Sequence, residues 1–228
     1  MLVGDLHVHT VCSDGLDTPE SIVSYAKRIG LDFVAITDHD TVSCIQRARV
    51  AGKELGVAVV PGVELTTRFG HILALFVEEV PPKDIYSDID ALLEWVEERN
   101  GLAIYAHPYG FLGFLPMHRN VVEIASKLHG IEIVNGRTLK RGNEKAMKLA
   151  QKLGKVVRTG GSDAHRVVEL GLVKTFVDAS SPNEDDVATA LAKGMVRISE
   201  PPPNTTIIKN IVSRIVSKVV LRFSRRSV

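Results

Sequence analysis

Residues 3–9 read VGDLHVH, a short apolar stretch that ends in two histidines. The stretch predicts a first β-strand over residues 3–8. His7 and His9 are two positions apart, so on a strand their side chains point to the same face and can share one ion. The glycine-rich phosphate loop of dinucleotide-binding sheets is missing after this strand. The start of the chain therefore argues against that open-sheet fold.

Strand and helix signals alternate along the rest of the chain. Further strands are predicted at 33–37, 58–63, 71–77, 102–106, 131–135, 156–159, 173–177 and 196–199. Helices are predicted between several of them, at 18–30, 42–55, 84–99, 143–153 and 184–193; the first opens with an N-cap, Thr18, followed by Pro19. Alternation of this kind predicts βαβ units and a parallel sheet. Histidines and acids at the strand ends favour a β/α barrel over an open doubly wound sheet.

Composition narrows the class of protein. The 228 residues are 45% hydrophobic and 24% charged, with a net charge of +1, which is the balance of a globular protein without a general affinity for polyanions. Two cysteines, Cys12 and Cys44, do not make a disulfide framework, and neither is placed like a thiolate ligand. No apolar run approaches the roughly 20 residues that span a bilayer. These features predict a soluble, cytoplasmic protein.

The C-terminal segment differs in charge from the body. Residues 201–228 hold six of the 28 basic residues and none of the 27 acidic ones, and they begin with three prolines. We therefore predict a barrel over 1–200 and a separate basic segment over 201–228. Apolar residues at helical spacing over 207–223 predict an amphipathic helix. Two roles stay open: docking onto the barrel or a partner subunit, which would make an oligomer, and association with nucleic acid or an anionic membrane surface.

Potential metal ligands follow most of the predicted strands. Each alone has an ordinary explanation, such as a hydrogen-bonded histidine or a turn aspartate. A barrel, however, brings successive strand ends to one rim, where such groups repel one another unless a cation pairs them. Imidazole and carboxylate together suit zinc, manganese or iron. The candidate ligands are His7, His9, Asp14, His39, Glu64, His71, His107, Asp163 and His165.

The ordered motifs DLHVHT (5–10), TDH (37–39), GVE (62–64), AHP (106–108) and GSDAH (161–165) resemble the polymerase and histidinol phosphatase (PHP) superfamily over residues 1–200. The resemblance implies a distorted (β/α)7 TIM-like barrel whose rim holds a trinuclear metal centre that hydrolyses phosphate esters. It assigns three divalent ions to three ligand sets: His7, His9, Glu64 and Asp163; Glu64, His71 and His107; and Asp14, His39 and His165. We place Glu64, Asp163 and His165 in the catalytic step.

The expected reaction is attack of a metal-activated hydroxide on phosphorus. The expected substrate is a nucleotide-like phosphomonoester or an oligonucleotide end, with Arg137 and Arg141 as candidate phosphate-binding residues. Histidinol phosphate is an alternative substrate. A non-catalytic RNA-binding barrel, similar to the ribonuclease P protein subunit, is an alternative of another class. Asp38 and Asp40 flank His39 and would either orient ligand imidazoles or cap the following helix.

Overall fold

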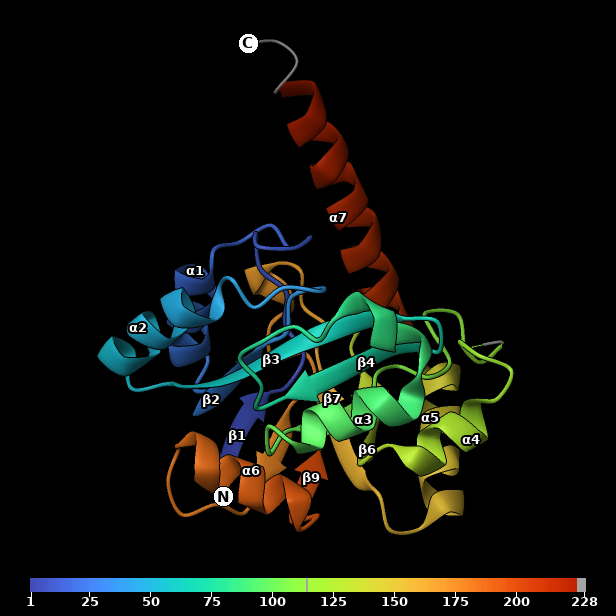
Figure 1. Ribbon diagram of the computed structural model, residues 1–228. Coiled ribbons are helices and arrows are strands. Elements are labelled where there is room, and N and C mark those ends of the chain that lie inside the picture. The colour runs from blue at the N-terminus through green and yellow to red at the C-terminus, as the bar shows by residue number, and fades with distance from the viewer. Residues whose placement is uncertain (114, 225–228) are drawn as a thin grey trace.

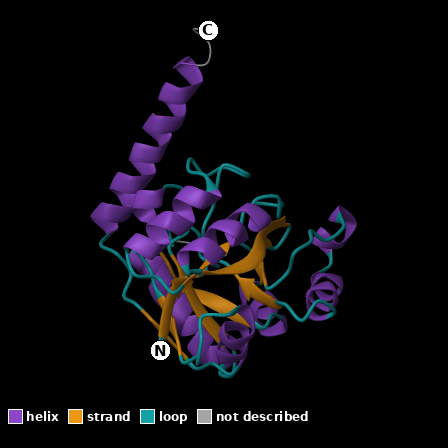
Figure 2. Ribbon diagram, turned by 90° about the vertical axis from the view of Figure 1, so that its left-hand side faces the viewer, coloured by secondary structure: helices purple, strands orange, loops and turns teal. Residues whose placement is uncertain are grey.

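The computed structural model describes residues 1–113 and 115–224, with the backbone alone for 218–224. Its strands form one sheet of nine, surrounded by helices (Figures 1 and 2). The strands are β1 (Leu2–Asp5), β2 (Phe33–Ile36), β3 (Ala58–Thr67), β4 (Gly70–Leu75), β5 (Leu102–Tyr105), β6 (Gly130–Asn135), β7 (Val157–Gly161), β8 (Thr175–Val177) and β9 (Val196–Ile198). All nine predicted strands are thus confirmed as elements of a mixed α/β fold.

The sheet curves into a nearly closed barrel. Its strand order is β7-β6-β5-β4-β3-β2-β1-β8-β9. β7, at one end of this order, contacts β8, the strand next to the other end: the Thr175 hydroxyl accepts from the Gly160 N–H at 3.0 Å and donates to the Gly160 carbonyl at 2.7 Å. The barrel therefore has nine strands rather than the seven that the family resemblance implied.

The sheet is mixed rather than parallel throughout. The pairs β1–β2, β2–β3, β5–β6 and β6–β7 are parallel, as predicted. β4 runs antiparallel to both β3 and β5, and β8 runs antiparallel to β1 and β9. Only residues 68 and 69 separate β3 from β4, which allows a hairpin but no crossover helix. The predicted parallel sheet is therefore confirmed for four strand pairs and wrong for β4, because of this hairpin, and for β8.

The helices pack around the outside of the barrel. They are α1 (Pro19–Arg28), α2 (Ile45–Leu55), α3 (Ile89–Glu97), α4 (Val121–Lys127), α5 (Lys140–Leu153), α6 (Glu184–Ala192) and α7 (Asn204–Ser224), with 3-10 turns η1 (Lys83–Ser87) and η2 (Val167–Glu169). The predicted start of α1 is confirmed: the Thr18 side chain accepts from Ser21 N, and Pro19 occupies the first turn. The short helix α4 was not predicted.

Three buried apolar clusters hold these layers together. One combines the barrel interior with α6 and includes Leu6, Phe33 and Ile104. The other two pack α1 and α2 against β2 and β3, and α3 to α5 against β4 to β6.

The C-terminal segment forms α7, which leaves the barrel body as a long projecting helix (Figure 1). The helical conformation of this segment is thus confirmed, while its amphipathic character and the division of the chain at residue 200 stay predictions. Two arginines of the predicted basic segment, Arg225 and Arg226, lie outside the described residues. Among the helices of the described residues, none combines the length and apolar character that crossing a bilayer requires.

Candidate metal centre

All nine predicted ligand side chains meet at one rim of the barrel. Most follow the carboxyl ends of parallel strands, which lie at the same end of a barrel. His71 comes instead from the start of β4, and it reaches the same rim because β4 is antiparallel to its neighbours. His7 and His9 are fully buried below the other groups. The remaining seven line one cavity of about 380 Å³: Asp14, His39, Glu64, His71, His107, Asp163 and His165.

Glu64 lies at the centre of this cluster. Its Oε2 is 3.1 Å from Nε2 of both His7 and His9, and 3.4 Å from His39 Nδ1. Its Oε1 is 2.8 Å from His71 Nδ1 and 2.9 Å from His107 Nε2. The Glu64 side chain is 1% exposed. One buried carboxylate therefore faces five imidazoles, with three grouped around one oxygen and two around the other.

Hydrogen bonds account for only some of these contacts, such as the one between His107 Nε2 and Glu64 Oε1 at 2.9 Å. His71 Nδ1 is close to Glu64 Oε1 but is not oriented for a hydrogen bond, and in the part of the chain that the structure describes Nδ1 of His9, His39 and His71 has no hydrogen-bond partner. His7 and His9 also face each other through Nε2 at 3.1 Å. Lone pairs that converge in this way repel unless a proton or metal ion lies among them. The donor set fits zinc, manganese or iron.

A second group of ligands surrounds Asp14 at the edge of the cavity. Its Oδ1 is 3.0 Å from His165 Nε2 and 3.9 Å from His39 Nε2. Ligand atoms of His9, Asp14, His39 and His165 all lie within 4.8 Å of one another. This group is adjacent to the Glu64 group, because the His9 and His39 rings stack at 4.6 Å.

Burial and charge shift the pKa values of the cluster strongly. Burial opposes the charged form of His9, but hydrogen bonds to Asp163 and Glu64 outweigh it and raise its pKa to about 9. For His7, burial also opposes the charged form, but the charges of Glu64, Glu132 and Asp163 outweigh it and raise the pKa. The pKa of Glu64 and of Asp163 lies well below the usual range, because the His7 charge overcomes their desolvation. In the metal-free pocket, the surrounding carboxylates therefore favour the charged form of an inner histidine.

The pKa values of the outer histidines are lowered rather than raised. Burial lowers the pKa of His165 to about 4 and also lowers that of His39. These rings are therefore neutral at physiological pH, which is the form that binds metal.

Glu132 orients the inner ligands, and sequence reasoning missed it. Its Oε1 accepts from His7 Nδ1 at 3.0 Å, which aims His7 Nε2 at Glu64. Its Oε2 accepts from the His107 backbone N–H and from Asn135 Nδ2, both at 3.0 Å. The available signal was an acid inside the apolar run Ile131–Val134, since a buried strand does not carry an unpaired carboxylate.

Two proposed ligands occupy uncommon backbone conformations. His107 has φ 26° and Asp163 has φ 53°, a region that few side-chain-bearing residues adopt. Such strain persists only where surrounding contacts hold it, and it clusters at functional sites.

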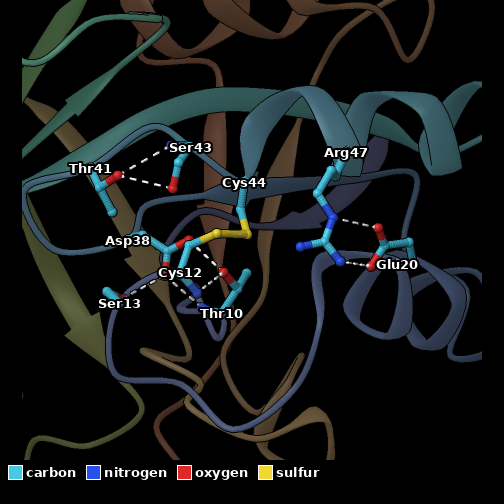
Figure 3. The surroundings of a disulfide bond; sticks show 9 residues. All are labelled: Thr10, Cys12, Ser13, Glu20, Asp38, Thr41, Ser43, Cys44 and Arg47. Atoms are coloured by element: carbon cyan, nitrogen blue, oxygen red, sulfur yellow. Dashed lines mark hydrogen bonds and ion pairs between the residues drawn. A yellow bond between two sulfur atoms is a disulfide. The ribbon is translucent and has the colours of Figure 1, made fainter.

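The loop that carries Asp14 is fixed by a disulfide and by a carboxylate. Cys12 and Cys44 are bonded, with Cα atoms 5.9 Å apart (Figure 3). Two cysteines make no framework of several disulfides, but they do form this single bond. The bond is possible because β1 and β2 are neighbours and bring the two loops together. Asp38 accepts from Thr10 N, Thr10 Oγ1 and Ser13 Oγ at 2.5–2.7 Å (Figure 3). Asp38 therefore holds this loop and caps no helix.

The two predicted phosphate-binding arginines have different surroundings. Arg137 lines the cavity, and its NH1 is 3.5 Å from Glu169 Oε2. Arg141 lies exposed in the first turn of α5 and is not among the residues that line the cavity. A third arginine, Arg214 of α7, lines the cavity and pairs with Asp14. Its position was not predicted, because the sequence does not show where α7 lies.

Comparison with known proteins gives family matches over most of the chain. The PHP domain model matches residues 5–153, and the PHP-associated model matches residues 140–196. An uncharacterized protein of Methanocaldococcus jannaschii is 34% identical over 154 residues, which are 60% of this chain and 89% of that protein.

Relatives with named activities match over shorter segments. A phosphoribosyl 1,2-cyclic phosphate 1,2-diphosphodiesterase of Eggerthella lenta is 42% identical over 36% of this chain and 33% of its own length. A 5'-3' exoribonuclease of Haemophilus influenzae is 37% identical over 35% of this chain and 30% of its own. The chain thus matches about a third of each of these two enzymes.

A solved structure has the same fold. A two-domain protein from Bacteroides vulgatus, containing a predicted PHP-like metal-dependent phosphoesterase, superposes with a TM-score of 0.71 and 23% identity. The alignment covers 87% of this chain and 64% of that one.

Proposed function

Because the chain belongs to the PHP domain family, we propose that it is a metal-dependent phosphoesterase, acting on a nucleotide-like phosphomonoester or an oligonucleotide end. The observation that carries this proposal is the buried Glu64 carboxylate facing five imidazoles. A match to the family would also be found for a chain that had lost its metal site. The convergence of the ligand atoms favours an intact, functional site.

We propose three divalent ions, zinc, manganese or iron, distributed over three ligand sets. The sets are His7, His9, Glu64 and Asp163; Glu64, His71 and His107; and Asp14, His39 and His165. Two observations support Glu64 as the shared ligand: its oxygens face separate groups of histidines, and both groups lie within 3.4 Å.

The reaction is hydrolysis, with water as the nucleophile. Ions bound at the rim would polarise the phosphate and lower the pKa of a water molecule. Glu64, Asp163 and His165 hold the reacting centre, with Glu132 keeping the His7 ring in the orientation that binding requires. Arg137 at the cavity wall would attract a phosphate oxygen. The buried position of His7 and His9 keeps bulk water away from the inner ligands.

The names of the relatives support phosphate esters of nucleotides or RNA as the substrate class. One relative is named for a cyclic phosphate ester and another for RNA. Histidinol phosphate stays an alternative substrate. The non-catalytic RNA-binding alternative is disfavoured, because such a scaffold would not require nine converging ligand side chains.

The test compares metal-free and reconstituted protein. Chelated protein, verified as metal-free by elemental analysis, is given zinc, manganese or iron and assayed on nucleoside monophosphates, end-labelled oligonucleotides and histidinol phosphate. We expect hydrolysis of at least one ester only after metal is added, and its loss in Glu64→Ala. Full turnover by the metal-free protein would contradict the proposal. RNA binding without hydrolysis would favour the alternative of another class.

A further inference from the structure

The C-terminal helix forms part of the cavity wall. Ile207, Ile211 and Arg214 recur at spacings of four and three, so they lie on one face of α7. Ile207 is 1% exposed, and Ile211 and Arg214 line the cavity that holds the proposed metal ligands. The opposite face of α7 is solvent-exposed, including Ile208 and Val212. The helix therefore contacts the barrel through the face that carries Arg214.

Polar contacts fix this part of α7 at three points around the rim. Asn204 Oδ1 accepts from the Lys140 N–H at the start of α5 at 2.9 Å. Ser213 Oγ accepts from Arg166 NH1 at 2.5 Å, beyond β7. Arg214 NH2 donates to the carbonyl of Asp14, at 3.1 Å, and to its carboxylate. Because these partners come from three separate loops and helices, Arg214 is held beside the cavity by the fold.

The Arg214 guanidinium retains donor capacity beyond these contacts. Its side chain is 15% exposed, and in the described chain its buried Nε has no hydrogen-bond partner. Arg137, which lines the same cavity, resembles it: the side chain is 16% exposed, and NH1 makes no hydrogen bond in the described chain, although it forms an ion pair with Glu169 at 3.5 Å. Buried guanidinium N–H groups that make no hydrogen bond are costly, so each such group calls for an explanation. Two arginines with such groups line one cavity, which points to an anion that binds there.

The Asp14 carboxylate can bind a metal ion and Arg214 at the same time, through different oxygens. Its Oδ1 faces His165 at 3.0 Å, whereas its Oδ2 faces Arg214. An ion bound among Asp14, His39 and His165 would use the first oxygen and leave the guanidinium in place. Arg214 therefore does not have to leave for the site to fill.

We propose that Arg214 is a substrate-binding residue, which donates from α7 to a phosphate oxygen held between it and Arg137. The inference rests on the proposed function, which supplies the anionic substrate. It concerns this chain rather than its family, because the matched family models end at residue 196 and α7 begins at Asn204. The C-terminal helix would thus contribute to affinity for the phosphate group.

The test measures binding of inorganic phosphate to metal-loaded protein by calorimetry, for wild type, Arg214→Gln and Arg214→Lys. Lys209→Gln is the matched control, since Lys209 is an exposed cation on the same helix. Metal content is measured for every variant. Loss of a charge-assisted hydrogen bond predicts an affinity about 10- to 100-fold weaker for Arg214→Gln. Arg214→Lys keeps the charge but not the planar guanidinium group, so its phosphate affinity should lie between those of Arg214→Gln and wild type. Lys209→Gln should match wild type.

Wild-type phosphate affinity in Arg214→Gln would overturn the inference. Loss of bound metal in that variant would also overturn it, because Arg214 would then act through Asp14. On a hydrolysed ester, we expect a raised KM with kcat changed less than about threefold. Phosphate binding does not depend on turnover, so wild-type protein that binds phosphate but hydrolyses no ester would refute the proposed function alone.

Discussion

Replacing Glu132 with glutamine tests whether this buried carboxylate positions the metal ligands. Glu132 Oε1 accepts from His7 Nδ1, and Oε2 accepts from the His107 N–H and from Asn135 Nδ2, all at 3.0 Å. A glutamine side chain has one carbonyl oxygen, so in either orientation its NH2 group faces a donor. The substitution Glu132→Gln changes few atoms but removes one accepting side and the charge.

The expected size of the effect follows from that geometry. One charge-assisted hydrogen bond contributes about 1.5 to 3 kcal/mol. Partners that orient a metal-ligating histidine typically affect metal affinity by about 10- to 100-fold. The two ranges agree, since about 1.4 kcal/mol corresponds to a factor of ten. We therefore expect Glu132→Gln to bind its tightest ion about 10- to 100-fold more weakly than wild type.

The assay is competition for metal against a chromophoric chelator. Glu97→Gln is the matched control, because Glu97 also pairs with a histidine, His129 at 3.3 Å, but at the surface and outside the cavity. Its metal affinity should equal that of wild type. Unchanged affinity in folded Glu132→Gln, or an equal loss in Glu97→Gln, would refute the reasoning.

Three further predictions concern the chain around this centre. Removing the disulfide in Cys12→Ser/Cys44→Ser frees a loop of 32 residues and should lower the unfolding free energy by about 3 to 4 kcal/mol, measured by urea denaturation against the wild type under oxidising conditions. For His9, burial lowers the pKa, but Asp163 and Glu64 outweigh it and raise it to about 9, against 6.5 in the unfolded chain. The stabilising contribution of His9 to the metal-free protein is thus full below pH 6.5 and is lost as the pH rises towards 9. Between these pH values, metal binding should release a proton from His9. Calorimetry in buffers of different ionisation enthalpy detects this release. Gly161→Ala would place a Cβ 2.4 Å from His7 Cβ, so it should reduce metal content at unchanged secondary structure, as checked by elemental analysis and circular dichroism.

Local sequence patterns were enough to predict the strands and the rim. Strand 3–8 ends in His7 and His9, and because parallel strands share one edge, side chains after β2, β5 and β7 had to approach them. The structure agrees with this expectation, because Glu64 lies within 3.4 Å of five imidazoles. The roles of these residues as metal ligands stay predictions, as does cytoplasmic location.

Other features depend on contacts between distant segments and have no local signal. The Cys12–Cys44 bond requires the packing of two loops, and the Asp14–Arg214 pair joins residues 200 positions apart. The antiparallel course of β4 follows from a hairpin too short for a crossover, which a pattern of apolar residues does not reveal. The role of Glu132 also has no local signal beyond one acid in an apolar strand, because the groups that it binds, His7 and the His107 N–H, come from other segments.

An anomalous difference map from crystals grown with excess manganese or zinc tests the central claim most directly. We expect peaks in the cavity lined by His71, His107 and Asp163, with at least two of them at about 2.0 to 2.2 Å from separate oxygens of Glu64. A map in which the cavity carries no peak, or in which the ions bind only at surface carboxylates, would contradict it.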